Sequence, residues 1–189
     1  AGTERSQFNE HSEALFLTSS FVFDNAAQAA ARFSGAEAGN VYSRFTNPTV
    51  TMFEQRLASL EGAEDCLATA SGMAAIMATC LAALRAGDHV VCAANVFGAT
   101  IQLFSNVLSR FDIAVSYVDA KDIEAWRAAA TPRTRLLYAE TPSNPLMELV
   151  DLVEFGKLGR ALGAISVVDN CFCTPALQRP FEFGVDVVI

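Results

Sequence analysis

The sequence predicts an α/β fold, in which a mostly parallel sheet carries helices on both faces. From about residue 66 onward, apolar runs of strand length alternate with helical patterns, which is typical of parallel strands joined by right-handed crossovers. Several runs are almost wholly apolar, as at residues 165–168, and this is expected for strands covered on both faces. Hydrophobic residues make up 52% of the 189 residues and charged residues 18%, which is enough for a sizeable core and excludes global disorder.

The first part of the chain has a different pattern. Residues 1–45 show little periodicity and predict an extended arm, with one short helix at the alanine-rich patch 26–31. Asn47 can cap a helix and Pro48 suits the first helical position, so a helix is expected to begin there. Gly62 suits its end. One apolar face is predicted from Val50, Phe53, Leu57 and Leu60.

The remaining residues are expected to form the sheet and its helices. Strands are predicted at 66–69, 89–93, 113–118, 134–139, 165–169 and 186–189. Helices are predicted at 72–85, 99–110, 122–130 and 151–162. Because ligands of open α/β sheets bind beyond the carboxyl ends of the strands, the residues after each run are the candidate site. The last run stops at the terminus without a cap, so we expect the chain to continue in the whole protein.

Composition narrows the function classes. The formal net charge of −8 argues against nucleic acid, because no basic stripe is present to neutralise phosphates. No apolar run reaches the ~18 residues of a membrane span, and the first ten residues do not resemble a signal peptide. The odd number of cysteines, five, without a CxxC pair, predicts free thiols in a reducing compartment such as the cytoplasm, and no metal site is expected.

Two segments could bind a phosphate and a flat ring. Ser71-Gly72-Met73 precedes an apolar helix, so its backbone N–H groups could bind an anion; the alternative is a serine N-cap followed by a flexible glycine. Phe97 precedes a glycine after a predicted strand and could stack on a planar ligand, although a core aromatic would show the same pattern.

Two further segments supply polar groups. The loop Glu140-Thr141-Pro142-Ser143-Asn144-Pro145 contains two prolines, and we expect it to present Ser143 and Asn144 rigidly, or else to be an ordinary turn. Asp169 ends a buried apolar run, where a carboxylate is costly unless it is paired. It could cap a turn or meet a cation on a ligand, and the second interpretation is slightly favoured.

Together these features match pyridoxal 5'-phosphate. Its phosphate suits the helix start at Ser71, its ring suits Phe97, its phenolic oxygen suits the Asn144 amide, and its pyridine nitrogen suits Asp169. A carboxylate there keeps the nitrogen protonated and makes the ring an electron sink.

Five ordered motifs then resemble the Cys/Met-metabolism family of pyridoxal-phosphate enzymes. They are Tyr42-Ser43-Arg44-Phe45-Thr46-Asn47-Pro48-Thr49, Ser71-Gly72-Met73-Ala74-Ala75, Gly87-Asp88-His89-Val90-Val91, Glu140-Thr141-Pro142-Ser143-Asn144-Pro145 and Val168-Asp169-Asn170. The resemblance implies the fold-type-I transferase architecture and a homotetramer of tight dimers. It also implies that 1–45 is an arm contributing to the neighbouring subunit's site, and that 46–189 is the first portion of the large cofactor-binding domain.

The resemblance also implies roles for the site residues. Tyr42 and Arg44 would bind the cofactor phosphate of the neighbouring subunit, and Ser71, Gly72 and Met73 the phosphate of their own. Asn144 would lie near the phenolic oxygen, and Asp169 would hold the pyridinium. The Schiff-base lysine and the C-terminal domain would lie beyond this chain, whose lysines are Lys121 and Lys157 only.

The family's usual residue at the stacking position is tyrosine, whereas this chain has Phe97. A phenylalanine at this position resembles the O-succinylhomoserine sulfhydrylase branch of the family. That resemblance implies γ-replacement on O-succinylhomoserine by sulfide, which gives homocysteine for methionine biosynthesis. The alternatives are cystathionine γ-synthase, O-acetylhomoserine sulfhydrylase and a methionine or cystathionine γ-lyase. An alternative of another class is a noncatalytic fragment or subunit that binds phosphate ligands. Cys171 replaces the family's threonine after Asp169-Asn170, and we expect a packed thiol there, with a reactive thiol as the alternative.

Overall fold

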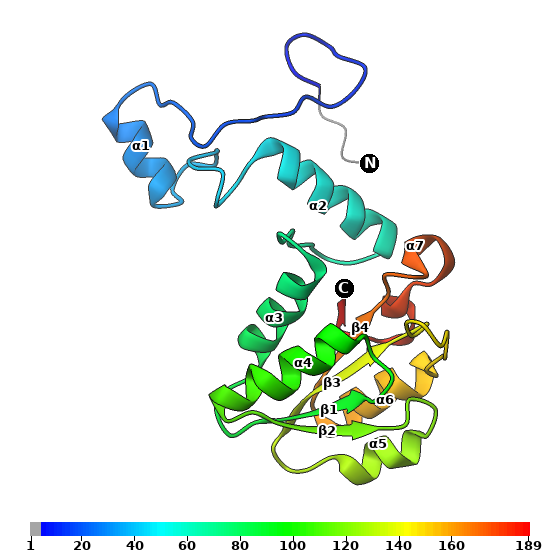
Figure 1. Ribbon diagram of the computed structural model, residues 1–189. Helices are drawn as coiled ribbons and strands as arrows, with labels where there is room; N and C mark the ends of the chain where they lie inside the picture. Colours follow the sequence, from blue (N-terminus) through cyan, green and yellow to red (C-terminus); the bar gives the residue numbers. More distant parts are fainter. Residues whose placement is uncertain (1–4) are drawn as a thin grey trace. The chain divides into compact units, whose positions relative to one another are not determined.

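The computed structural model describes residues 5–189, and the chain divides into two compact units, Ala1–Ala68 and Thr69–Ile189. The first unit holds helices α1 (Ala26–Phe33) and α2 (Pro48–Glu61), joined by extended segments (Figure 1). No helix within residues 5–189 has the length and apolar character needed to cross a membrane.

Helix α2 begins and ends where the sequence predicts. The Asn47 side chain accepts a hydrogen bond from the Thr49 N–H, and Gly62 ends the helix in the left-handed region at φ 75°. Its predicted apolar face is largely uncovered in this chain, because Val50, Phe53 and Leu60 are exposed.

The second unit is a five-stranded parallel sheet in the order β2-β1-β3-β4-β5. Its strands are β1 (His89–Ala93), β2 (Ala114–Val118), β3 (Thr134–Glu140), β4 (Ile165–Asp169) and β5 (Val187–Val188). Its helices are α3 (Gly72–Ala83), α4 (Gly98–Asn106), α5 (Ile123–Ala129), α6 (Leu152–Leu162) and α7 (Thr174–Leu177), with short 3-10 helices at η1 (Leu108–Phe111) and η2 (Pro180–Phe183). The predicted α/β class is therefore confirmed.

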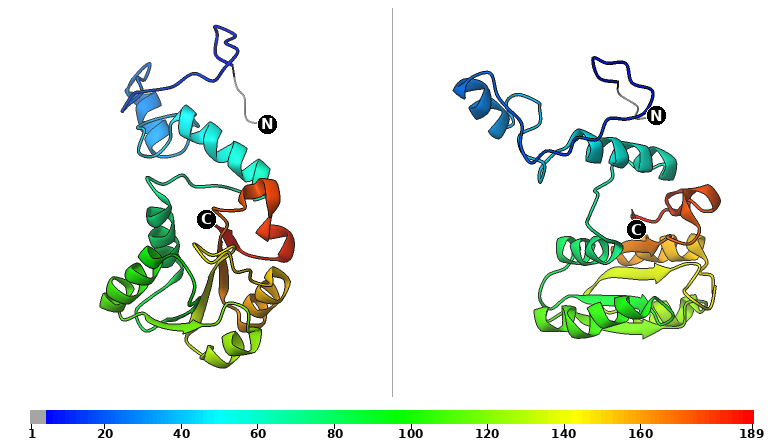
Figure 2. Two further views of the ribbon diagram at one scale, coloured as in Figure 1. Left: turned by 45° about the vertical axis from the view of Figure 1, so that its right-hand side comes forward. Right: turned by 45° about the horizontal axis from the view of Figure 1, so that its top comes forward.

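The sheet is a layer between two pairs of helices. Helices α3 and α4 pack together on one side of it, and α5 and α6 pack together on the other (Figure 2). On the first side Phe104 meets Tyr138 edge to face, and on the second Trp126 meets Phe155 in the same way, each pair with ring centroids 5.2 Å apart. Burial on both sides explains why the central strands have so few polar residues.

The predicted strand at 66–69 is wrong. This segment is irregular, its Leu67 side chain is 79% exposed, and the Ala68 N–H donates to the Glu54 carboxylate rather than to a strand. An apolar run this short forms a strand only when a neighbouring strand satisfies its backbone groups, and the sheet offers none here. The predicted helix 99–110 is also interrupted, because α4 ends at Asn106 and η1 follows.

Helix α6 lies unusually close to the segment that leads into β5. A Cβ atom at Gly156 would collide with the Phe183 carbonyl oxygen, so only glycine fits at this position. The start of β5 is held further by the Ser166 hydroxyl, which donates to the Asp186 carboxylate over 2.7 Å.

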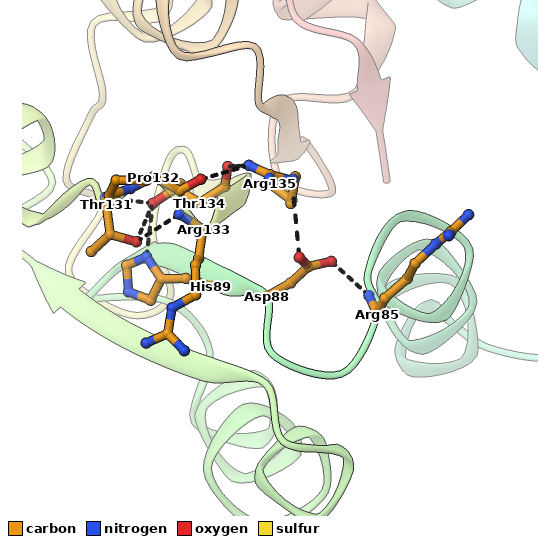
Figure 3. A network of polar contacts seen from close by, with 8 residues as sticks. All are labelled: Arg85, Asp88, His89, Thr131, Pro132, Arg133, Thr134 and Arg135. Atoms are coloured by element: carbon orange, nitrogen blue, oxygen red, sulfur yellow. Dashed lines mark hydrogen bonds and ion pairs between the residues drawn. The ribbon is translucent and has the colours of Figure 1, made fainter.

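A buried histidine joins three strands at the amino edge of the sheet. Nδ1 of His89 lies 2.8 Å from the Thr134 hydroxyl of β3, and Nε2 lies 3.0 Å from the Ser116 hydroxyl of β2. Figure 3 shows the surrounding polar network, in which the Asp88 carboxylate accepts from the Arg85 N–H. Burial, together with the nearby Arg133 cation, lowers the pKa of His89, so the imidazole is neutral in the folded chain at pH 7.

Replacing His89 with glutamine should reduce the free energy of unfolding at pH 8 by about 1–3 kcal/mol, because one strand hydroxyl loses its partner. Below about pH 6.5 the unfolded chain takes up a proton at this histidine before the folded chain does, so only the parent loses stability from this site. The difference in the free energy of unfolding between the parent and the variant should therefore become smaller toward pH 5, as measured by urea unfolding of the full-length proteins. A difference that stays constant from pH 8 to pH 5 would contradict this account.

Candidate functional site

A cavity of about 320 Å³ lies in the second unit, at the carboxyl ends of its strands. Six of the eight residues predicted to bind a cofactor line it: Ser71, Gly72, Met73, Phe97, Asn144 and Asp169. Its walls also include Thr100, Glu140, Pro142, Cys171 and Phe172. Parallel strands bring these segments together because all their carboxyl ends meet at one edge.

The start of α3 forms one wall. Ser71 is the N-cap, and its hydroxyl oxygen accepts from the Ala74 N–H over 3.1 Å, so the capping alternative is correct for this side chain. The first N–H groups of a helix have no acceptor within it, which leaves those of Gly72 and Met73 for a ligand. A Cβ atom at Gly72 would meet nothing within 4 Å, so the approach to these groups is open. The helix start can therefore both be capped by Ser71 and bind an anion.

Phe97 forms a second wall at the N-terminus of α4. It occupies the N-cap position, where its side chain can make no hydrogen bond, and the ring is 47% exposed. The predicted alternative of a core aromatic is therefore wrong for this residue. A partly exposed ring on a cavity wall can stack on a planar ligand.

The loop after β3 presents Asn144 but not Ser143. Ser143 is fully buried, and its hydroxyl accepts from the Glu148 N–H. The Thr141 hydroxyl accepts from the Val150 N–H and closes the same loop. These hydrogen bonds close the loop, whereas the prediction that Ser143 faces a ligand is wrong, because its polar atoms hold the loop together.

Glu140 was not singled out from the sequence, yet it joins two walls of the cavity. It is 6% exposed, and its carboxylate accepts from the Phe97 N–H over 2.7 Å and from the Asn144 N–H over 2.9 Å. Burial raises the pKa of Glu140, the nearby Asp169 charge adds to this, and the two amide hydrogen bonds oppose it. The reasoning applied to Asp169, an acid ending an apolar run, would also have found Glu140.

Asp169 ends β4 and is the register partner of Glu140. Its carboxylate accepts from the Cys171 N–H over 3.1 Å and lines the cavity, so it both closes a turn and faces the space for a ligand. Burial is the main reason that the pKa of the Cys171 thiol is raised to about 11, and the Asp169 carboxylate adds to it. The thiol is therefore protonated at neutral pH. Cys171 itself is exposed, so the expectation of a packed thiol is wrong.

The other candidates lie elsewhere. Tyr42 and Arg44 belong to the first unit, where the guanidinium carbon of Arg44 lies 5.2 Å from the Tyr42 ring centroid. Lys121 pairs with Glu148 over 2.6 Å and Lys157 with Glu154 over 2.8 Å, and neither lysine lines the cavity. Within residues 5–189 no three His, Cys, Asp or Glu side chains are grouped to hold a metal ion.

A second hollow, of about 350 Å³, lies in the first unit beside α2. Its carboxylate, Glu10, already accepts from the Ser6 N–H and hydroxyl, both over 2.7 Å. The helix start that lines it is Pro48, which has no N–H to offer an anion, and the next N–H, that of Thr49, already donates to Asn47. The cavity in the second unit, where Ser71 leaves the Gly72 and Met73 N–H groups for a ligand, is therefore the better candidate site.

The side chains around the cavity in the second unit fit pyridoxal phosphate. The helix start offers N–H groups to a phosphate, Phe97 offers a face to a ring, Asn144 offers an amide, and Asp169 offers a carboxylate. The volume is at the lower end of the range for small-molecule sites.

Comparison with known proteins gives the family that the five sequence motifs resemble. The sequence profile of Cys/Met metabolism PLP-dependent enzymes matches residues 1–189. An O-succinylhomoserine sulfhydrylase of Pseudomonas aeruginosa is 56% identical over 189 residues, covering 100% of this chain and 47% of that protein. An L-methionine gamma-lyase of Pseudomonas putida is 43% identical over 175 residues, covering 93% of this chain and 44% of that protein.

Among solved structures, a Campylobacter jejuni protein assigned as an O-acetylhomoserine (thiol)-lyase superposes with a TM-score of 0.94 at 32% identity, covering 100% of this chain and 46% of that one. It contains N'-pyridoxyl-lysine-5'-monophosphate. The chain thus spans about half the length of the relatives it matches.

Replacing Asp169 with asparagine should accelerate alkylation of Cys171 severalfold at pH 8 in the cofactor-free, full-length protein. The substitution removes the negative charge that helps to raise the pKa of this thiol, so the thiolate fraction rises. Mass spectrometry after timed iodoacetamide treatment would follow Cys171, with Glu154→Gln on the surface of α6 as the control. Equal alkylation rates in the parent and the Asp169 variant would contradict the assigned interaction.

Proposed function

Because this chain belongs to the Cys/Met metabolism family of PLP-dependent enzymes, we propose that the full-length protein catalyses γ-replacement on O-succinylhomoserine. The bond between the γ-carbon and the succinyl oxygen would break first and release succinate, and sulfide would then form a bond to the γ-carbon, giving homocysteine. The observation that carries this choice is Phe97, a ring without a hydroxyl on the wall of the cavity. The 56% identity to an O-succinylhomoserine sulfhydrylase supports the same choice.

Five residues on the cavity wall have a role in this proposal. The N–H groups of Gly72 and Met73 bind the phosphate, the Phe97 ring stacks on the pyridine, and the Asn144 amide donates toward the phenolic oxygen. Asp169 accepts a hydrogen bond from the ring nitrogen and holds a proton there. Bound pyridoxal phosphate supplies an electron sink for negative charge developing on the substrate.

Two further parts of the active site would come from residues that do not line the cavity. The base that moves protons at the α- and β-carbons would be a lysine beyond the present sequence, because both lysines of this chain are exposed and paired with carboxylates. Tyr42 and Arg44 would reach the phosphate of a neighbouring subunit within a homotetramer of tight dimers. Five unpaired cysteines favour a cytoplasmic enzyme.

A γ-lyase is the second candidate, because a methionine γ-lyase is 43% identical to this chain. Elimination and replacement would use the same cavity residues up to the departure of the γ-substituent, so Phe97 is the main residue that separates the two reactions. A tyrosine hydroxyl at the stacking position could transfer protons during elimination, and Phe97 lacks that group.

The proposal is tested on the full-length protein with a panel of substrates. A visible absorbance band that borohydride erases should show lysine-bound cofactor. O-succinylhomoserine with sulfide should then give the highest kcat/KM for homocysteine, ahead of O-acetylhomoserine with sulfide and of O-succinylhomoserine with cysteine. Faster sulfide-independent release of 2-oxobutanoate would instead support a lyase.

The Phe97→Tyr variant should shift the balance toward elimination. It adds a hydroxyl that can transfer protons at the cavity wall while the ring can still stack, so the ratio of 2-oxobutanoate to homocysteine should rise severalfold. Both products would be measured in one reaction with O-succinylhomoserine and sulfide. An unchanged ratio would remove Phe97 as the reason for preferring replacement.

A further inference from the structure

We propose that Glu140 is a positioning residue, whose single carboxylate sets the separation between the Phe97 ring and the Asn144 amide on the wall of the proposed cofactor site. It acts through the backbone of both residues. The inference rests on the proposed cofactor site, although the hydrogen bonds themselves do not depend on it.

The geometry gives each carboxylate oxygen one amide. Oε2 accepts from the Phe97 N–H over 2.7 Å, and Oε1 accepts from the Asn144 N–H over 2.9 Å. Both distances are those of strong hydrogen bonds to a charged acceptor. Phe97 lies 43 residues from Glu140 in sequence and Asn144 lies four, so one side chain links two segments that are far apart in the chain. The same two segments are also joined by the Asn95 amide, which donates to the Glu148 carboxylate over 3.0 Å.

The bond to Phe97 takes the place of a missing helix cap. Phe97 is the N-cap residue of α4 and has no side-chain oxygen to cap with. In a capping box, a glutamate of the same helix accepts from the N-cap N–H, and here Glu140 of β3 does so from outside the helix. Its negative charge at the start of α4 is also favoured by the helix dipole. The direction of the Phe97 ring is thereby tied to β3.

Glu140 is itself held firmly in place. Glu140 is the last residue of β3, which pairs with β1 on one side and β4 on the other and is buried almost throughout. Its side chain is 6% exposed, so little water is available to replace either amide. Loss of one hydrogen bond would therefore leave a backbone N–H poorly satisfied and its loop free to shift.

Two substitutions distinguish the effect of the size of the Glu140 side chain from the effect of its charge. Glu140→Gln keeps the size of the side chain but replaces one acceptor oxygen with an NH₂ group, which cannot accept from a backbone N–H. Glu140→Asp keeps the charge but is one methylene shorter, so it cannot reach both amides. Glu154→Gln, an exposed glutamate of α6 paired with Lys157, is the matched control.

The experiment uses the full-length protein and measures backbone amide exchange without cofactor, followed by binding of pyridoxal phosphate. In Glu140→Gln, exchange at Phe97, Asn144 or both should accelerate about tenfold or more, because a hydrogen bond to a charged acceptor is lost. Exchange at the Cys171 amide, which Asp169 holds, should be unchanged. Pyridoxal phosphate should bind about tenfold more weakly, with reduced visible circular dichroism of the bound cofactor. Glu154→Gln should match the parent in every measurement.

Two outcomes would overturn the proposal. Unchanged exchange at both Phe97 and Asn144 would show that Glu140 does not hold these loops. Faster exchange with parental cofactor affinity and circular dichroism would show that the loops are held for stability alone. If Glu140→Gln does not fold, Glu140→Asp provides the same comparison. A parent that binds no pyridoxal phosphate would reject the proposed cofactor site, while amide exchange would still decide whether Glu140 holds both loops.

Discussion

Two carboxylates at paired register on neighbouring strands are the constraint on which the site depends. Glu140 ends β3, Asp169 ends β4, and their backbones are partners in the ladder. Like charges so close, and partly shielded from water, are unfavourable unless donors surround them. The donors are backbone N–H groups of the loops that follow the strands, at Phe97, Asn144 and Cys171. The need to stabilise two acids therefore fixes where the walls of the cavity lie.

The two edges of the sheet are organised differently. At the amino edge, His89 bonds to one hydroxyl on each neighbouring strand, and its donors and acceptors stay within the protein. At the carboxyl edge, helix N–H groups that have no acceptor within their helix, an exposed ring and a carboxylate face a cavity. Polar groups that are satisfied internally stabilise a fold, whereas convergent groups with remaining capacity can bind a ligand.

The sequence was sufficient for the parallel sheet and for half of the residues that line the cavity, because burial on both faces leaves long apolar runs and parallel strands bring their carboxyl ends to one edge. It failed at 66–69, where a short apolar run predicts a strand without showing whether another strand lies beside it. It also failed at Ser143, because whether a hydroxyl faces a ligand or its own loop depends on backbone angles that residue types do not encode.

The partners of Glu140 could not be predicted for a related reason. Its two partners, Phe97 and Asn144, contribute backbone groups, and a backbone N–H carries no signal in the identity of its residue. A sequence can indicate that a buried acid needs donors, but the donors become visible only in three dimensions.

The close approach at Gly156 shows how a local preference can be sacrificed for the tertiary structure. Alanine is favoured over glycine within a helix by roughly 1 kcal/mol, so α6 would form more readily by itself with alanine at this position. The missing methyl group instead lets the Phe183 carbonyl lie against the helix, on the route into β5. An engineer who idealised this helix would strengthen one element and displace the outermost strand, so tolerance to mutation at this position depends on the neighbouring backbone rather than on helix propensity.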